Sequence, residues 1–559
     1  MLFEVPGAIR SLRSPFQKKG TDRPIQGGTM KQSLAVAAIL LLANLGGLPA
    51  SAQDEPAVNA AAPTEGTVAA ATPRRSVLRR GTGRQAAVIR SRGGPPVTAP
   101  GTSTAQTPGA GTAPGASGTS GGISGARRAT NVQGNTATPT TPTTLPPGTL
   151  DFGNGITAVA NYTGEVAGNP FGGIKQGARY ADQFLLGVDI DLDKFAGLTG
   201  SSLHAIGTQR NGQSLSKDLV GNSISVQEIY GGGQTYRLTY LSFEQKLFDD
   251  RVDFEVGRLP GQVAFLANPL HCNFQNNSIC GSPNIAFADT NFTFFPAPTW
   301  AGTLKLKLTD KYFFNIGAYE VAPSSVERPD HGVDFFAKAT GYNVPFELGY
   351  ATTFANDAMP RHFGVGAIID QSTYSDAVLD TQGGSSFFTG LSPEQRFGRT
   401  LAYQRFDQMV YRPDPESPRG LTVFGIALEG TGGRQVEDYY LGFGAVYLGP
   451  FESRPYDSID AFVSTQAYSD IGLSNIRTVR RNAGLSADTA TNTTFFELNY
   501  GIQVSPAVRF TPNLQYILDP DQIRYPTRLK PIPDTLVIGA KLSVDFFTLA
   551  GLAKGPGSI

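Results

Sequence analysis

The stretch that decides the fold runs from Ser242 to Gly281 and reads SFEQKLFDDRVDFEVGRLPGQVAFLANPLHCNFQNNSICG. It contains an alternating segment, an Asp-Asp turn, a second alternating segment and a long polar segment with both cysteines. From Val252 to Val256 apolar and acidic residues alternate strictly, so an extended strand has one apolar and one charged face. Such a hairpin fits a membrane barrel whose outer face meets lipid and whose inner face meets water.

The period of two recurs through the rest of the chain. Thr303–Thr309 places its leucines on one face and its threonines and lysines on the other. Further alternating rows of apolar residues occur at Phe314–Ala318, Phe346–Phe354, Tyr439–Tyr447, Phe496–Val504 and Leu536–Phe546. At roughly 25 residues per strand with its loop, residues 148–547 predict an all-β fold, a transmembrane antiparallel β-barrel of about 16 strands.

A large soluble β-sandwich or propeller would also alternate. The inward positions of the rows are Lys, Glu, Asn, Gln and Gly, which suit a water-filled lumen better than a packed core. Aromatic residues also gather near strand ends, as at Tyr312–Phe314 and Phe495–Phe496, where the girdles of a membrane barrel lie. Helical periods are scarce, although Leu391–Asp407 can hold a short helix or a long external loop.

Residues 1–52 have the layout of a leader with a secretory signal peptide. Met30 and Lys31 open a basic region, Leu34–Leu45 is an apolar core, and Ala50-Ser51-Ala52 is a small-residue cleavage site. We expect translation to start at Met30 and cleavage to follow Ala52. The alternative is a membrane anchor that is never cleaved. Either way, the sequence predicts export.

Residues 53–147 form an arm of Ala, Thr, Pro and Gly without any Phe, Tyr or Trp. The arm cannot bury enough apolar surface to offset the entropy of folding, so we expect it to be disordered. The arm contains nine arginines and three acidic residues, and this positive charge is suited to contact with an anionic cell-wall polymer. The alternative is that the arm is only a solvated tether. Nucleic acid is a poor partner for an exported chain. Residues 148–559 carry 31 basic and 41 acidic side chains, and 548–559 form a C-terminal tail.

Cys272 and Cys280 enclose a short polar segment in a chain bound for an oxidising compartment, which predicts a disulfide. No catalytic constellation or metal motif is recognisable, since the four histidines are scattered singly and no His-Glu-x-x-His exists. The sequence therefore predicts no enzyme activity, no cofactor and no bound metal.

The chain resembles the carbohydrate-selective porins of the OprB family. Four segments carry the resemblance: Leu241–Val252 with Val256–Leu259, Cys272–Pro283, Trp300-Ala-Gly, and the closing pair Gln515–Asp521 and Leu536–Phe547. The resemblance covers most of residues 150–547 and implies a 16-stranded channel for sugars such as glucose, with the cysteine loop as its gate. Two features depart from the family pattern. Twelve residues follow Phe547, where such porins usually end on an aromatic residue, and the arm is an addition.

Selectivity in a pore depends on its width and on the polar groups at its narrowest point. Arg258 lies where a strand leads into the cysteine loop and is our first candidate for a constriction donor. By parity, the other candidates for the pore lining are Glu244, Lys246, Asp253, Glu255, Lys305 and Lys307. The alternative is that these are ordinary lumen charges that pair with one another and with water.

The leading hypothesis is passive diffusion of sugars through the outer membrane of a Gram-negative bacterium, with the arm in the periplasm. The alternatives are a general diffusion porin, an anion-selective channel, and a structural or adhesive protein that the barrel anchors. The expected partners are sugars and outer-membrane lipid, with a homotrimer and cell-wall contact through the arm left open.

Overall fold

The computed structural model describes residues 148–556, apart from positions 267, 282, 355, 415, 416 and 418. The leader with Met30 and Ala52, the arm of residues 53–147 and the end of the tail lie outside the described residues. The two ends of the described chain, at residue 148 and in the tail, lie close together, because Gly148 N donates to Lys554 O at 2.8 Å.

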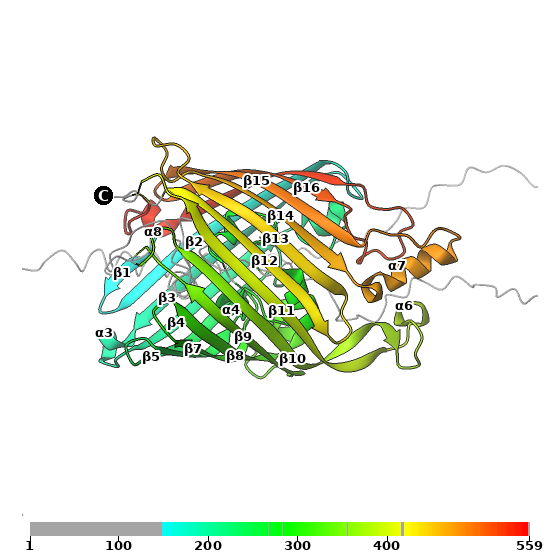
Figure 1. Cartoon of the computed structure of the whole chain (residues 1–559), viewed down its shortest axis with the longest axis horizontal. Coiled ribbons are helices and arrows are strands. Elements are labelled where there is room, and N and C mark those ends of the chain that lie inside the picture. The colour runs from blue at the N-terminus through cyan, green and yellow to red at the C-terminus, as the bar shows by residue number, and fades with distance from the viewer. Residues whose placement is uncertain are drawn as a thin grey trace, which may run out of the picture. The chain divides into compact units, whose positions relative to one another are not determined.

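The described part of the chain is a barrel of long, tilted strands (Figure 1). The barrel strands are β2 (Ile156–Phe171), β3 (Gly177–Asp191), β4 (Ser201–Gly212), β5 (Tyr236–Leu247), β6 (Val252–Leu259), β7 (Thr299–Lys307), β8 (Tyr312–Val321), β9 (Gly341–Ala351), β10 (Arg361–Asp380), β11 (Pro393–Tyr411), β12 (Gly420–Gly432), β13 (Glu437–Leu448), β14 (Ser458–Tyr468), β15 (Asn492–Ser505), β16 (Val508–Leu518) and β17 (Thr535–Asp545). Each strand pairs antiparallel with the next.

The ring closes where the last strand meets the first barrel strand, because β17 pairs with β2 with Lys541 opposite Glu165. A short additional strand, β1 (Leu150–Gly153), pairs with the start of β2. The predicted closed antiparallel barrel of 16 strands is thereby confirmed.

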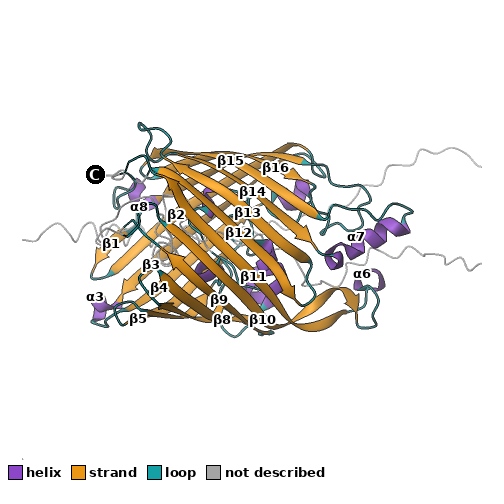
Figure 2. Ribbon diagram, in the orientation of Figure 1, coloured by secondary structure: helices purple, strands orange, loops and turns teal. Residues whose placement is uncertain are grey.

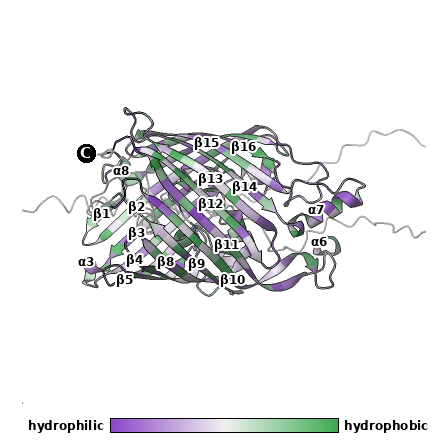
Figure 3. Ribbon diagram, in the orientation of Figure 1, coloured by the Kyte–Doolittle hydropathy of each residue, from purple (hydrophilic) through white to green (hydrophobic). Residues whose placement is uncertain are grey.

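Side chains alternate between the two faces of the wall as predicted. On β15, Phe496 and Leu498 are exposed on the outside, whereas Glu497 and Asn499 between them are buried inside. Figure 3 shows the same alternation as stripes of apolar and polar residues along the strands. The predicted Asp-Asp turn is present as well, since β5 ends at Leu247 and β6 begins at Val252.

The two ends of the barrel differ in the length of their connections. At one end the turns are short, as at 248–251, 308–311 and 506–507, and α3 (Leu192–Ala196) and α8 (Phe546–Leu549) lie there. At the other end the loops are long and carry α6 (Ser386–Thr389) and α7 (Asp470–Asn482), which project beyond the strands (Figure 2). No helix among the described residues is long and apolar enough to cross a membrane.

The prediction of a helix or external loop at Leu391–Asp407 is wrong, because this segment forms most of β11. Its outward row contains Gln404 and its inward row contains Arg399 and Arg405, so neither face has an unbroken apolar row. Two ends of predicted rows also differ. β9 stops at Ala351, before Thr352 and Phe354, and Phe546 begins α8.

The inner face is less uniformly polar than predicted. On β12 the inward residues Phe424, Ile426 and Leu428 are buried and apolar. They belong to one apolar cluster with residues of the cysteine loop, including Phe274 and Ile279. The polar-lumen expectation fails there because protein, and not water, covers that part of the wall.

Candidate functional site

The cysteine loop of residues 260–298, which we name the disulfide loop, folds into the barrel. It holds α4 (Gln262–Phe265), η2 (His271–Asn273) and α5 (Asn284–Thr290), and α4 lies behind the front strands in Figure 1. The loop contacts inward side chains around the wall; its hydrogen-bond partners include Asn315, Asn343, Asp370, Arg399, Asp407, Glu437, Tyr440, Ser464, Glu497, Asn499, Asn513, Gln515 and Lys541. These strands stand on opposite sides of the ring, so the loop crosses the lumen.

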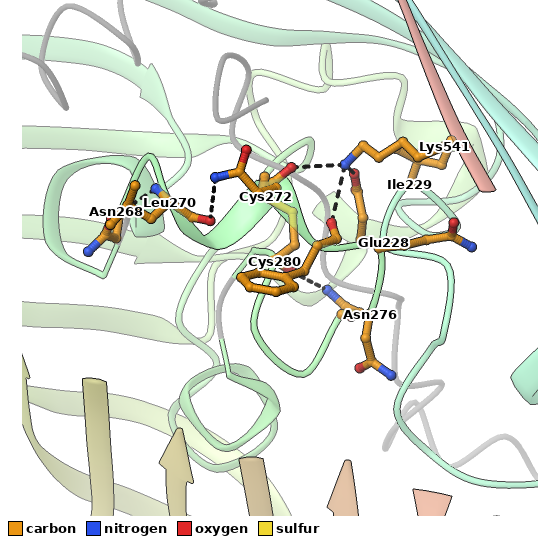
Figure 4. Close-up of a disulfide and its surroundings, with 12 residues drawn as sticks. Glu228, Ile229, Asn268, Leu270, Cys272, Asn276, Cys280 and Lys541 are labelled. Carbon is orange, nitrogen blue, oxygen red and sulfur yellow. Dashed lines mark hydrogen bonds and ion pairs between the residues drawn. A yellow bond between two sulfur atoms is a disulfide. The ribbon is translucent and has the colours of Figure 1, made fainter. Parts of the chain in front are cut away.

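Cys272 and Cys280 form the predicted disulfide within this loop (Figure 4). Between them, the backbone N–H groups of Gln275 and Asn276 donate to the two carboxylate oxygens of Glu497 at 2.7 and 2.8 Å. The Asn276 amide also donates to Gln515 on the neighbouring strand at 2.8 Å. The covalent bond closes the turn, and Glu497 attaches the turn to the wall.

Aromatic packing holds the loop on other sides of the lumen. The Phe274 ring lies 4.8 Å from that of Phe462 and 5.9 Å from that of Phe424, measured between ring centroids. Earlier in the loop, Phe265 packs edge-on against Tyr319 of β8 at 6.1 Å. Burial of such rings contributes about 1.5–3 kcal/mol each, so the apolar contacts stabilise the inward position of the loop.

A second loop, residues 213–235 between β4 and β5, meets the disulfide loop inside the barrel. Glu228 N donates to Gln275 O, and Asn277 N donates to Ser225 O, both at 2.9 Å. The Ile229 N–H donates to the Glu165 carboxylate on β2 at 3.4 Å. The two loops together therefore narrow the passage next to β2 and β17.

A buried cluster of charged side chains lies where these loops meet the wall. Lys541 Nζ is 2.6 Å from Glu228 Oε1 and 3.7 Å from Glu165 Oε1, and it also donates to the carbonyl of Cys272 at 3.2 Å (Figure 4). Arg210 on β4 interacts electrostatically with both glutamates. We name these four residues, Arg210, Glu165, Glu228 and Lys541, the arginine–glutamate cluster.

Several polar atoms of this cluster have no hydrogen-bond partner among the described residues. Arg210 Nε donates to Gln183 at 2.8 Å, but both terminal nitrogens of its guanidinium are unpaired. Glu165 Oε1 and Glu228 Oε2 likewise accept no hydrogen bond. The ring of Phe295 lies 5.7 Å from Arg210 Cζ. The cluster thus offers donors, acceptors and an aromatic ring close together.

Most of the pore-lining residues predicted from sequence lie on the inner face nearer the short turns. Glu255 is buried and accepts a hydrogen bond from Tyr240 at 2.8 Å. Lys246 donates to Glu244 at 2.9 Å, and Glu244 also lies 3.4 Å from His204 Nε2. Asp253 and Lys305 occupy paired positions on β6 and β7, and Lys307 is exposed at the end of β7.

These residues are separate from the arginine–glutamate cluster. Glu244 pairs with Ser202 near the start of β4, whereas Arg210 lies near the other end of that strand. The structure brings Glu244, Lys246 and Glu255 together on neighbouring strands, where they are paired with one another and with their neighbours.

The prediction of Arg258 as a constriction donor needs correction. The strand β6 stays regular through Leu259, so Arg258 shares a row with Leu241 and Trp300, whose side chains are exposed on the outside. Its guanidinium is buried under the β8–β9 loop, where it donates to the carbonyls of Asp334 and Pro298 at 3.2 Å each. Arg258 therefore lies on the opposite face of the wall from Glu255.

The arginine–glutamate cluster was not predicted from the sequence. Glu165 is the one charged residue in the inward row of β2, and Lys541 stands between Gly539 and Ser543 in the inward row of β17, so the sequence carried a signal for these two. Glu228 stands in an irregular loop, and Arg210 stands near the end of a strand, where alternation gives no indication of their positions. Among residues 148–556 as described, no group of three or more His, Cys, Asp or Glu is arranged to hold a metal ion.

Comparison with known proteins agrees with this architecture. Residues 175–546 match the family model described as "Carbohydrate-selective porin, OprB family". Porin B of Pseudomonas aeruginosa is 30% identical over 403 residues, which cover 69% of this chain and 86% of that protein. The putative porin QuiX of Acinetobacter baylyi is 26% identical over 395 residues, or 66% of this chain and 83% of that protein.

A solved structure gives the same result. The high-pH structure of OprB from Pseudomonas putida superposes with a TM-score of 0.64 at 28% identity, covering 70% of this chain and 94% of that chain. The match of the family model spans more than half of the chain and includes both inward loops. The chain belongs to the carbohydrate-selective porins of the OprB family.

Proposed function

We propose that neutral sugars diffuse passively through this barrel and contact the arginine–glutamate cluster on the way. The observation that carries the proposal is the buried Arg210, whose two terminal nitrogens have no hydrogen-bond partner among the described residues, together with one oxygen each of Glu165 and Glu228 that accepts no hydrogen bond there. A sugar has neighbouring hydroxyls that both donate and accept hydrogen bonds. The guanidinium fork can donate to two of them and the carboxylates can accept from others when a local movement of the 213–235 loop uncovers these buried atoms.

The charges of the cluster suit a neutral solute. Two buried cations, Arg210 and Lys541, stand next to two buried carboxylates, so the cluster as a whole carries no strong charge. An anion-selective channel would require an excess of cations at this point. The disulfide loop supports selectivity further, because its contacts around the wall hold the passage in one shape.

Sugar-induced block of single-channel current in planar bilayers tests this proposal. In Arg210→Gln we expect the glucose concentration for half-block to rise about tenfold to a hundredfold, since hydrogen bonds to a charged group contribute about 1.5–3 kcal/mol. Arg258→Gln is the matched control, because it removes an arginine on the outer face of the wall. Equal block in Arg210→Gln and the unmodified chain would exclude the cluster as a sugar contact.

A general diffusion porin is the second candidate. Liposomes that contain the protein should admit glucose much faster than amino acids of similar size if the passage selects sugars. Equal rates would favour the general porin and would leave the barrel architecture untouched.

We also propose the outer membrane of a Gram-negative bacterium as the location. Short turns of such barrels face the periplasm and long loops face outward. Residue 148 lies at the short-turn end, next to Lys554, which supports a periplasmic position for the preceding arm.

Deletion of residues 53–147 should leave sugar flux intact and should abolish binding to isolated cell wall if the arm makes that contact. Wall binding that persists in the deletion variant would show that the arm does not make this contact. Cross-linking in native membranes tests the homotrimer.

A further inference from the structure

The β8–β9 loop, residues 322–340, which we name the rim loop, passes from the inner to the outer face of the wall. It contains η3 (Pro323–Val326) and η4 (Arg328–Asp330). On the inner side, Arg237 of β5 donates to the carbonyls of Ser325 and Glu327 and to Asp330 at 3.1 Å. At the edge itself, Leu238 N donates to His331 O at 2.9 Å.

Beyond His331 the rim loop lies on the outer face. Arg258 donates to the carbonyl of Asp334 at 3.2 Å, and the indole N–H of Trp300 donates to the carbonyl of Phe335 at 2.9 Å. The Phe335 ring packs 6.0 Å from the Trp300 ring and covers the Arg258 guanidinium. Four side-chain contacts therefore hold residues 334 and 335 against the outside of the barrel.

This arrangement leaves an apolar tip that no described residue covers. Phe336 is 96% exposed and Val333 is 51% exposed, although Phe335 between them is packed down. Full exposure of a phenylalanine next to a firmly held residue is unfavourable in water by about 1.5–3 kcal/mol relative to burial. A cover supplied from outside the chain would remove that cost.

The height of this tip on the barrel indicates what the cover is. Trp300 and Tyr342, 43% and 52% exposed, end the outward rows of β7 and β9 on the long-loop side. Below Tyr342 the outward row of β9 continues with apolar residues to a second tyrosine, Tyr350, at the short-turn side. Apolar rows between aromatic ends mark the hydrocarbon belt and its two interfaces.

We propose that Val333 and Phe336 insert into the membrane interface at the long-loop end and anchor the rim loop on lipid. The bond from Trp300 to Phe335 places Phe336 at the height of the girdle, where aromatic rings partition well. Lys338, exposed two residues later, is positioned for the anionic headgroups of the same leaflet. This inference rests on the membrane placement of the barrel proposed above.

The chain contains a single tryptophan, which makes a fluorescence test direct. In a Trp300→Phe background, which keeps a ring against Phe335, one new tryptophan is introduced at a time: Phe336→Trp, Phe346→Trp or Phe388→Trp. Phe346 lies in the apolar outward row of β9, and Phe388 is exposed in α6 on a different long loop. Each variant is reconstituted into vesicles with lipids that carry a nitroxide at a shallow or a deep position of the acyl chain.

The expected result is strong quenching of Phe336→Trp by the shallow nitroxide, with blue-shifted emission and protection from acrylamide. Phe346→Trp should respond to the deep nitroxide, and Phe388→Trp to acrylamide alone. If Phe336→Trp behaves like Phe388→Trp while Phe346→Trp is quenched, the rim loop does not insert. If Phe346→Trp is not quenched, the membrane placement itself is overturned, and the inference with it.

The same three variants with Trp300 retained exclude an effect of the background substitution. Trp300 adds a constant signal to each, so the difference between Phe336→Trp and Phe388→Trp should persist. A difference that disappears would show that the loss of the Trp300 hydrogen bond had moved the loop, and would overturn the proposed position.

Discussion

Arg237 and Arg258 stand on neighbouring strands, point to opposite sides of the barrel wall, and bind the same loop. Arg237 reaches Ser325, Glu327 and Asp330 from inside, and Arg258 reaches Asp334 from outside. Arg237 also donates to the carbonyl of Gly232 at 3.0 Å, in the loop that carries Glu228. The inner arginine thus joins the rim loop to the 213–235 loop, and the outer arginine joins the rim loop to the end of the disulfide loop at Pro298.

Replacement of each arginine should separate these two roles. Arg258→Ala should raise hydrogen exchange in residues 333–338 and next to Pro298, whereas Arg237→Ala should raise it in residues 325–332 and 228–234. Each change leaves carbonyl groups unsatisfied, so we expect a local loss of about 1–3 kcal/mol. Exchange measured by mass spectrometry on the reconstituted protein decides the point. Identical patterns in the two variants would contradict the division of roles.

Loss of the disulfide should make the disulfide loop inside the channel more mobile, but the barrel should still form. The double variant Cys272→Ser/Cys280→Ser gives up at most about 3 kcal/mol of chain entropy for so small a ring. Glu497 and Lys541 still hold the same turn. We expect a normal heat-dependent gel shift, a modest fall in Tm and more open-channel current noise. A barrel that fails to form would show that the bond has a larger role.

Glu497→Gln should weaken the attachment of the disulfide loop to β15. The amide keeps the shape of the side chain but offers one acceptor in place of two, so one of the N–H groups of Gln275 and Asn276 loses its partner. We expect higher conductance and weaker preference for glucose over amino acids. Glu452→Gln, on an exposed turn residue, serves as the control. If conductance is unchanged in Glu497→Gln, the apolar contacts of the disulfide loop, and not Glu497, hold the loop in position.

Lys541→Met should destabilise the protein strongly, because it leaves Glu165 and Glu228 buried without the ammonium group that pairs with both. Breaking a buried ion pair by removal of one partner costs about 3–5 kcal/mol. Adding Glu228→Gln should restore part of that loss, since the remaining carboxylate then has no like charge next to it. Urea unfolding of the two single variants and the double variant measures the coupling. If the changes in the free energy of unfolding of the two single variants simply add in the double variant, Lys541 and Glu228 do not interact, which would contradict a shared cluster.

The docking of α5 should depend on pH. Asp289 accepts the backbone N–H groups of Val436 and Glu437 at 3.0 and 2.9 Å, and burial raises the pKa of Asp289 to about 6. A carboxyl group whose pKa is raised on folding favours the docked state below its ordinary pKa near 3.8, and this contribution is lost as pH rises through about 6.

Hydrogen exchange of residues 284–290, corrected for the intrinsic rate, should therefore show more protection at pH 4.5 than at pH 7.5. Arg399, which donates to Ala288 O, and the carboxylate of Glu437 face the same helix, so part of the dependence belongs to them. Asp289→Asn should flatten the profile. A profile with the same slope in that variant would exclude Asp289 as the titrating group.

Local alternation explains why the barrel was predictable from the sequence. Rows such as Phe496–Val504 depend only on which face each residue occupies, and an unbroken row needs no knowledge of distant contacts. Where polar residues such as Gln404 face outward, the row breaks, and β11 was missed. Arg258 continues the outward row of Val252, Phe254 and Val256, so strand parity places it outside, although its position next to the disulfide loop favours the lumen.

The position of the disulfide loop could not be inferred in this way. Its anchors are far away in the chain: Glu497 is 222 residues from Gln275, and Lys541 is 269 residues from Cys272. Burial of Phe424, Ile426 and Leu428 on the inner face of β12 follows from the same docking. A strand that is apolar on both faces was the one local sign that protein fills the lumen there.

The bond from Lys541 to the carbonyl of Cys272 also has a consequence for the order of assembly. Lys541 stands on the last strand and Glu165 on the first barrel strand, and their side chains come together only when β17 pairs with β2. The disulfide can form earlier, but the lysine that holds its loop meets Glu165 only at that final pairing. A barrel in which β17 and β2 are not yet paired would therefore lack part of the contacts that shape the passage. Closure of the wall and completion of the channel thus occur in the same step.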